Sequence, residues 1–214
     1  MGDEFCPQCE QHVGYCVCSH GASWSEWDSS SSEKVIKKRL RDLLKPGADL
    51  TWANLSSARL TGIDLSGANL SKGDLSGKNF SDAKLVGTFF MDADLHSAVL
   101  KNADLYNANL RSANLSSANL RSADLTLANL TLANLKWAKL RKVVLEEAIA
   151  RGANLSGAEL TNASMRHMNL IDATLTKAWM MDANLTNANL TNANLTNANL
   201  TNANLTDATM PEHS

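Results

Sequence analysis

Four cysteines near the N-terminus have the residue types and spacing of a metal site. They are all the cysteines of the chain and follow the pattern C-x2-C-x6-C-x-C, with two histidines close by. Zinc prefers a tetrahedral set of four thiolate or imidazole ligands, and a C-x2-C turn presents two thiolates together. The sequence therefore predicts a structural zinc site whose ligands are Cys6, Cys9, Cys16 and Cys18, with His12 or His20 able to replace one cysteine.

Two other states of these cysteines stay open. A pair of disulfides would need an oxidising compartment, which the N-terminus does not suggest because it has no basic region followed by an apolar run. Unliganded or redox-active thiols are the other alternative. Zinc is favoured because residues 1–20 have almost no apolar core, so a metal would have to supply the folding free energy. Residues 21–32 are serine-rich and are expected to form a flexible linker.

Catalytic motifs are missing from the remainder of the sequence. It contains no glycine-rich phosphate loop, no HExxH motif and no nucleophile elbow. Serine and threonine are frequent, but they recur at fixed outward positions of a repeat rather than beside a base. We therefore expect a protein that is not an enzyme.

The elements that would position any functional residue follow a five-residue period. From Ala48 onward the unit A-(D/N)-L-(S/T/R)-X recurs in one unbroken frame, and its central residue always falls on a multiple of five, from Leu50 to Met210. Of these 33 centres, 27 are leucine. A helix repeats every 3.6 residues and a strand every two, so a period of five predicts a repeated bend with two inward and three outward positions in each unit.

This pattern resembles the pentapeptide-repeat family over residues 48–210. The resemblance implies an all-β fold, a right-handed quadrilateral β-helix with four units per coil and the centres stacked along its axis. The 33 centres would then make about eight coils. Lys139–Arg151 is the least regular stretch; we favour an irregular coil there over a short inserted helix, because the frame resumes unshifted at Ala153.

The two ends of the repeat differ. Residues 33–45 have an apolar stripe at helical spacing and are followed by Pro46 and Gly47, so we predict a helix that caps the first coil. Its basic residues are interpreted as a solvated face rather than a nucleic-acid site. Residues 186–205 are four identical units with only a short tail, 211–214, after the last repeat, so we predict a homodimer formed through the C-terminal coil. The alternative is that Pro211 and the tail are enough to protect the open strand edge from pairing.

Two groups of outward residues are candidates for binding a partner. If residues 20 apart stack, three cations fall in one row, where they can contact phosphate or an acidic protein surface. Three large apolar residues take outward positions that are normally small or polar, which makes a contact patch. The cations are Lys101, Arg121 and Arg141, and the apolar residues are Leu127, Leu132 and Trp137.

Charge and hydropathy narrow the functional classes. The chain has 20 basic and 22 acidic residues and no apolar run long enough to span a membrane, so a cytoplasmic protein is expected. We predict a non-enzymatic scaffold, or protein-interaction rod, with an N-terminal metal-stabilised segment. Two alternatives remain: a DNA-mimicking protector of gyrase, as in some family members, and a purely structural solenoid. The first fits poorly because residues 48–210 hold 14 acidic and 14 basic side chains.

Overall fold

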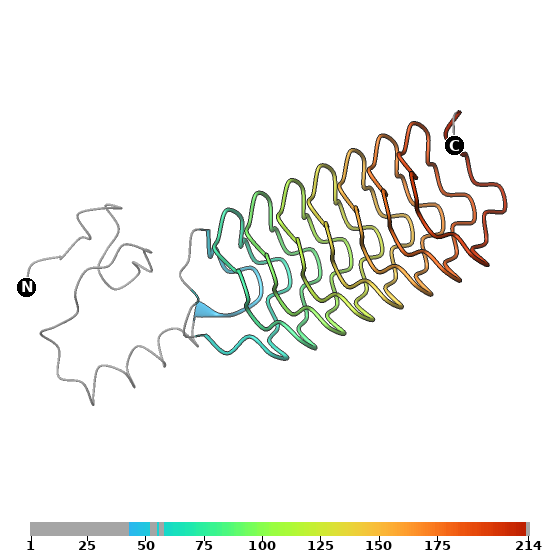
Figure 1. Ribbon diagram of the computed structural model, residues 1–214. Helices are drawn as coiled ribbons and strands as arrows, with labels where there is room; N and C mark the ends of the chain where they lie inside the picture. Colours follow the sequence, from blue (N-terminus) through green and yellow to red (C-terminus); the bar gives the residue numbers. More distant parts are fainter. Residues whose placement is uncertain (1–42, 52–54, 56–57, 213–214) are drawn as a thin grey trace, which may run out of the picture.

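The computed structural model describes residues 43–51, 55 and 58–212, and they form one elongated rod. Figure 1 shows coils of similar size stacked along a single axis, from the N-terminal end of the repeat to the C-terminus. Leu43 is helical, and the chain enters the first turn at Pro46 and Gly47. Leu44 and Lys45 form a bend, so the helix predicted over residues 33–45 ends at Leu43, two residues earlier than expected; residues 33–42 lie outside the described residues. Within the described part of the chain, no helix is long and apolar enough to cross a membrane.

The coils are joined by parallel β-bridges between residues 20 apart. These bridges run without interruption of the frame from Asp49–Asn69 and Asp64–Lys84 to Asn189–Thr209, and each joins the residue that precedes one centre to its counterpart on the next coil. A spacing of 20 residues is four five-residue units, so each coil contains four units. Residues that differ by 20 therefore lie side by side on the same side of the rod.

The core is built from two positions of each unit. The centres from Leu50 to Leu190 are buried, and the residue two before the centre is a buried alanine in most units. This confirms the predicted inward positions. Phe80 and Phe90 pack edge to face, with ring centroids 6.3 Å apart. Thr88 takes an alanine position beside them, where it is fully buried and its hydroxyl donates to the carbonyl of Leu65 at 2.9 Å.

The corners of the coil have a left-handed backbone. The residue two after the centre has a φ between 54° and 67° in every unit from Gly62 to Asp207. The amide that follows each corner donates back to the carbonyl of the centre, as in Ala108 to Leu105 at 2.9 Å. A positive φ at the third residue of such a turn is the pattern of a type II turn. We name this residue the corner residue of its unit.

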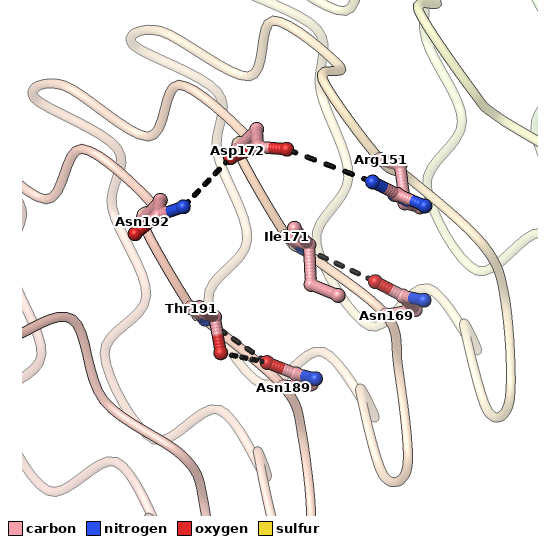
Figure 2. Close-up of polar contacts among 7 residues, drawn as sticks. All are labelled: Arg151, Asn169, Ile171, Asp172, Asn189, Thr191 and Asn192. Atoms are coloured by element: carbon pink, nitrogen blue, oxygen red, sulfur yellow. Dashed lines mark hydrogen bonds and ion pairs between the residues drawn. The ribbon is translucent and has the colours of Figure 1, made fainter.

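Each regular unit satisfies all five of its backbone amides. Four bond to backbone carbonyls, and the amide of the residue after the centre bonds to the side-chain oxygen of the Asp or Asn before the centre. Figure 2 shows this Asx contact at Asn169 and at Asn189, which accepts from both the amide and the hydroxyl of Thr191. In one unit the five donors are Ala108, Asn109, Leu110, Arg111 and Ser112. The acidic or amide residue of the repeat is thus part of the backbone hydrogen-bond network.

The stretch that we expected to be irregular is an ordinary coil. Lys139, Val144 and Ile149 form the same parallel bridges as their neighbours, to residues 20 further on. Val143 and Ala150 replace the usual alanine and leucine, and both are fully buried. The expected irregularity was wrong because these substitutions exchange one apolar residue for another and leave the five-residue frame intact.

The last coil is an open end of the core. Leu195, Leu200, Leu205 and Met210 are only partly buried, unlike the centres before them. In earlier coils the amide of each centre bonds to the carbonyl 19 residues further along, as in Leu190 to Thr209 at 2.8 Å, but for these four amides no acceptor lies among the described residues. The last described coil therefore has centres that are less buried than those before it.

Candidate functional site

The three predicted cations lie in one row on one side of the rod. The residues before their centres, Val99, Asn119 and Lys139, form successive parallel bridges, so Lys101, Arg121 and Arg141 occupy consecutive coils. We name this side, with centres at every twentieth residue from Leu60 to Leu200, the cationic side. The row predicted from the sequence is therefore confirmed as a geometric feature, while its binding role stays a prediction.

One ion pair crosses the cationic side. The Nη2 atom of Arg121 lies 3.1 Å from Oε2 of Glu159, two coils further along, so the guanidinium reaches over the coil of Leu140. The side chains are 40% and 35% exposed, so solvent weakens the pair and its contribution to stability is small. The Nε atom of Arg121 is buried and has no hydrogen-bond partner among the described residues.

A hollow lies beside this ion pair. It is lined by charged residues at one end and by large apolar residues at the other. Trp179, at the apolar end, is 56% exposed, although it takes a position where the repeat normally has Asp or Asn. The lining residues are Arg121, Arg141, Glu159, Thr161, Trp179 and Met181.

The same side lacks the Asx contact on three consecutive coils. Lys139, Glu159 and Trp179 replace the Asp or Asn before the centre. In the described part of the chain no atom accepts from the amides of the residues after those centres, Arg141, Thr161 and Met181. At the coil before them the contact is intact, and the Arg121 amide donates to Asn119 at 3.3 Å. Sequence reasoning missed this feature, although three departures from the repeat 20 residues apart are visible in the sequence.

The three predicted apolar residues do not form one patch. Leu127, Leu132 and Trp137 are corner residues of successive units, so they lie at three different corners of one coil. These residues are 38%, 59% and 54% exposed, respectively. Leu132 packs toward Gly152 and Trp137 toward Gly157, each one coil further on. A partner that bound all three would have to wrap around the rod.

The predicted zinc site lies outside the described residues. The four cysteines and both nearby histidines are in residues 1–42, of which the structure describes nothing. Within the described ranges, no three His, Cys, Asp or Glu side chains are grouped so that they could hold a metal ion. The zinc site therefore stays a prediction from sequence.

Comparison with known families identifies the repeat. A family model described as pentapeptide repeats matches in eight copies, over residues 48–85, 74–111, 108–146, 138–176, 151–187 and 178–211. A comparison with curated proteins found no match.

Two solved structures illustrate the similarity. HetL, a pentapeptide repeat protein involved in heterocyst differentiation regulation in the cyanobacterium Nostoc, is 35% identical over 79% of this chain and 85% of its own, with a TM-score of 0.41. QnrB1, a plasmid-mediated fluoroquinolone resistance protein, is 19% identical over 77% of this chain and 84% of its own, with a TM-score of 0.63. The match to QnrB1 shows a shared fold.

Proposed function

The chain belongs to the pentapeptide-repeat family, and we propose that it is a non-enzymatic protein-interaction scaffold. The observation that carries this proposal is the contrast between a uniform rod and one side that departs from the repeat. On the cationic side, Lys139, Glu159 and Trp179 take the place of residues that would complete the backbone hydrogen bonds. These substitutions remove the Asx contact on three consecutive coils. This loss supports the proposal that the cationic side binds a partner.

The arrangement of reactive side chains supports a role other than catalysis. The rod spreads side chains in rows, whereas catalysis needs groups that converge on one reacting atom. His96 contacts the hydroxyls of Ser116 and Ser97 at 2.9 and 3.1 Å, but this group is exposed to solvent. His167 is a corner residue on a different side, so the two histidines do not act together.

We further propose that the rod is a right-handed quadrilateral solenoid of about eight coils, with a helix that begins near residue 33 and ends at Leu43 as its N-terminal cap. The four-unit register and the parallel bridges support this geometry. A cap is needed because the first coil would otherwise expose its core to water. A cytoplasmic location is part of the same proposal.

The N-terminal segment is proposed to hold one structural zinc ion. The composition of residues 1–20 supports this, since its ligand-forming cysteines are close together and it has few apolar residues to form a core. Native mass spectrometry before and after a chelator tests the zinc site. A mass increment of one zinc that the chelator removes is expected, and a disulfide-closed, metal-free mass would contradict the proposal.

The C-terminal coil is proposed to form a homodimer. The partly buried centres from Leu195 to Met210, together with their amides, which have no acceptor among the described residues, support this contact because a second copy can cover both. Sedimentation of the full chain over a range of concentrations tests it. A strict monomer at high concentration would contradict the dimer and leave the scaffold proposal unaffected.

Protection of gyrase from quinolones is the alternative function, suggested by the structural likeness to QnrB1. A rod that mimics DNA must be strongly acidic, whereas residues 48–210 carry equal numbers of acidic and basic side chains. The exposed cationic row is also opposite in sign to a DNA surface. A supercoiling assay with gyrase and a quinolone is expected to show no protection at saturating protein.

Affinity capture with the full chain tests the scaffold proposal against a purely structural rod. Parallel captures use a chain that begins at Pro46 and a full chain in which Arg121 and Arg141 are both changed to glutamate. A scaffold retains a partner in stoichiometric amount, and the comparison locates the contact on the N-terminal segment or on the rod. If none of the three retains a partner under conditions where all are folded, the purely structural alternative is supported.

A further inference from the structure

Three consecutive coils of the cationic side have a backbone amide that lacks an acceptor among the described residues. In a regular unit the amide after the centre points outward, because its acceptor is the outward side chain before the centre, as in Arg121 and Asn119. The amides of Arg141, Thr161 and Met181 are in equivalent positions and have no acceptor among the described residues. Stacked coils are about 4.8 Å apart, so the three donors form a short, evenly spaced column.

No other side of the described rod has three such coils in succession. Elsewhere the Asx contact is missing at single coils, as at Met91, or at two in succession, as at Glu146 and Arg166. The column of donors also coincides with the row of cations, since Arg141 contributes both its amide and its guanidinium. Backbone donors and guanidinium groups that face the same space favour a negatively charged ligand.

The apolar end of the hollow adds a second preference. Trp179 and Met181 flank the centre Met180, and the exposed indole of Trp179 is directly beyond Glu159 along the rod. The Arg121–Glu159 ion pair spans the charged end. A ligand that lies along the rod therefore meets cations and amide donors first and a large apolar surface next.

We infer that the cationic side binds an extended acidic polypeptide segment with a large apolar side chain beside its carboxylates. The carboxylates lie over Lys101, Arg121 and Arg141 and accept from the amides that lack an acceptor, and the apolar side chain packs between Trp179 and Met181. This inference rests on the scaffold function proposed above and names the chemistry of the partner. Among the described residues, Lys101 and Arg141 form no ion pair, which leaves both available to the ligand.

Glu159 competes with a ligand carboxylate for the guanidinium of Arg121. Its Oε2 atom lies 3.1 Å from Nη2 of Arg121, where a ligand carboxylate would otherwise bind. Binding of the acidic segment must displace it or share the guanidinium, so removal of the Glu159 charge strengthens binding.

A polypeptide fits this side better than a nucleic acid. Single-stranded nucleic acids bind along cationic grooves that offer an aromatic side chain to successive bases. Among the residues that line the hollow, Trp179 is the one aromatic residue, and it lies at one end. An acidic peptide with a single apolar anchor uses both ends of the hollow.

The test is a fluorescence anisotropy titration of the full chain with a labelled dodecapeptide of alternating aspartate and serine that has a phenylalanine at each end. Arg141→Glu and Trp179→Ser are each expected to weaken binding about tenfold or more, because they remove a cation and the apolar anchor. Arg111→Glu reverses the same charge on another side and is expected to change affinity by less than about twofold. Thermal unfolding of each variant verifies that it is folded.

Glu159→Gln and Glu159→Asn separate the role of the amides from that of net charge. Both remove the same charge and release Arg121, but only asparagine has the side-chain length that restores the repeat contact to the Thr161 amide. Both are expected to bind the peptide more tightly than the natural chain, and the glutamine variant about threefold more tightly than the asparagine variant, since its Thr161 amide stays available.

Two results would overturn the inference. One is an equal loss of affinity in Arg141→Glu and Arg111→Glu, which would mean that binding responds only to total charge. The other is tighter binding of a single-stranded dodecanucleotide than of the peptide. The capture experiment separates this surface from the scaffold function: if the peptide does not bind, but a captured partner is retained equally by the chain with both Arg121 and Arg141 changed to glutamate, the scaffold function stands and this assignment of its surface fails.

Discussion

The indole ring of Trp137 fills the space that a Cβ atom on Gly157 would occupy, one coil further along the same corner. Cε3 and Cζ3 of the ring would both clash with that atom. Gly157 has a φ of +67°, as the corner requires, but so do residues of many other types at equivalent corners. Its lack of a side chain is therefore needed for the approach of Trp137 as well as for the backbone.

Gly157→Asn is expected to displace Trp137 and to lower the free energy of unfolding by about 1–3 kcal/mol, since the indole loses its packing surface. Asparagine is chosen because it tolerates the left-handed conformation. Gly77→Asn is the matched control: Gly77 lies in the same corner column with a φ of +64° and nothing within 4 Å of its Cβ position. Chemical denaturation of both variants measures the difference, and equal losses would show that the Trp137 contact contributes nothing.

A second prediction concerns leucine at a left-handed corner. Leu127 has a φ of 61° and Asn107, one coil earlier in the same column, has a φ of 54°. A non-glycine residue in this conformation is strained by about 1–2 kcal/mol, and asparagine is strained less than leucine. Leu127→Asn is therefore expected to raise the free energy of unfolding, and Asn107→Leu to lower it. Urea unfolding of the two variants checks the opposite signs; two changes of the same sign would exclude backbone strain as the cause.

The aspartates of the Asx contacts predict how stability depends on pH. The hydroxyl of Ser76 donates to Asp74 at 2.7 Å, and together with the Ser76 amide it lowers the pKa of this carboxyl. Because the folded-state pKa is below the unfolded value, the stabilisation is fully present above the unfolded pKa and is lost as the pH falls through the folded pKa. Asp49 and Asp64 have a lowered pKa for the same reason, with Thr51 and Ser66 as donors.

Ser76→Ala is expected to raise the pKa of Asp74 toward its ordinary value, which a carboxyl titration followed by nuclear magnetic resonance measures directly. Asp74→Asn keeps the acceptor and removes the titration, so it is expected to reduce the loss of stability in acid. An unchanged Asp74 pKa in Ser76→Ala would contradict the assigned role of the hydroxyl.

Thr88 tests a buried hydrogen bond in the core. Its hydroxyl donates to the Leu65 carbonyl at 2.9 Å and is fully shielded from solvent. Thr88→Val keeps the shape and removes the donor, so the free energy of unfolding is expected to fall by about 1 kcal/mol. Thr161→Val is a control because the Thr161 hydroxyl makes no hydrogen bond within the described residues. A loss as large in the control would point to the added methyl group rather than to the hydrogen bond.

Much of the rod could be predicted from the sequence because its frame never shifts. Each unit contributes the same two inward positions, so a period of five identifies the buried residues from Leu50 onward without knowledge of any contact. The cationic row followed from the same frame once four units per coil were assumed from the family resemblance. Ala150 stands where the repeat usually has leucine, so it departs from the pattern of residue types but not from the five-residue frame. The irregular coil expected around it was therefore wrong.

Only the tertiary structure decided what each outward residue contacts, because those contacts depend on backbone angles and on neighbouring coils. The ion pair joins Arg121 to a residue 38 positions away, and Trp137 meets Gly157 across a coil boundary. The glycines at corner positions are a sequence signal for a left-handed backbone, which the five-residue period alone does not reveal. The lack of an acceptor for the amides of Arg141, Thr161 and Met181 among the described residues is likewise a property of the folded coil. The five-residue period specifies which side chains face inward, whereas the contacts of an outward side chain depend on how successive coils stack.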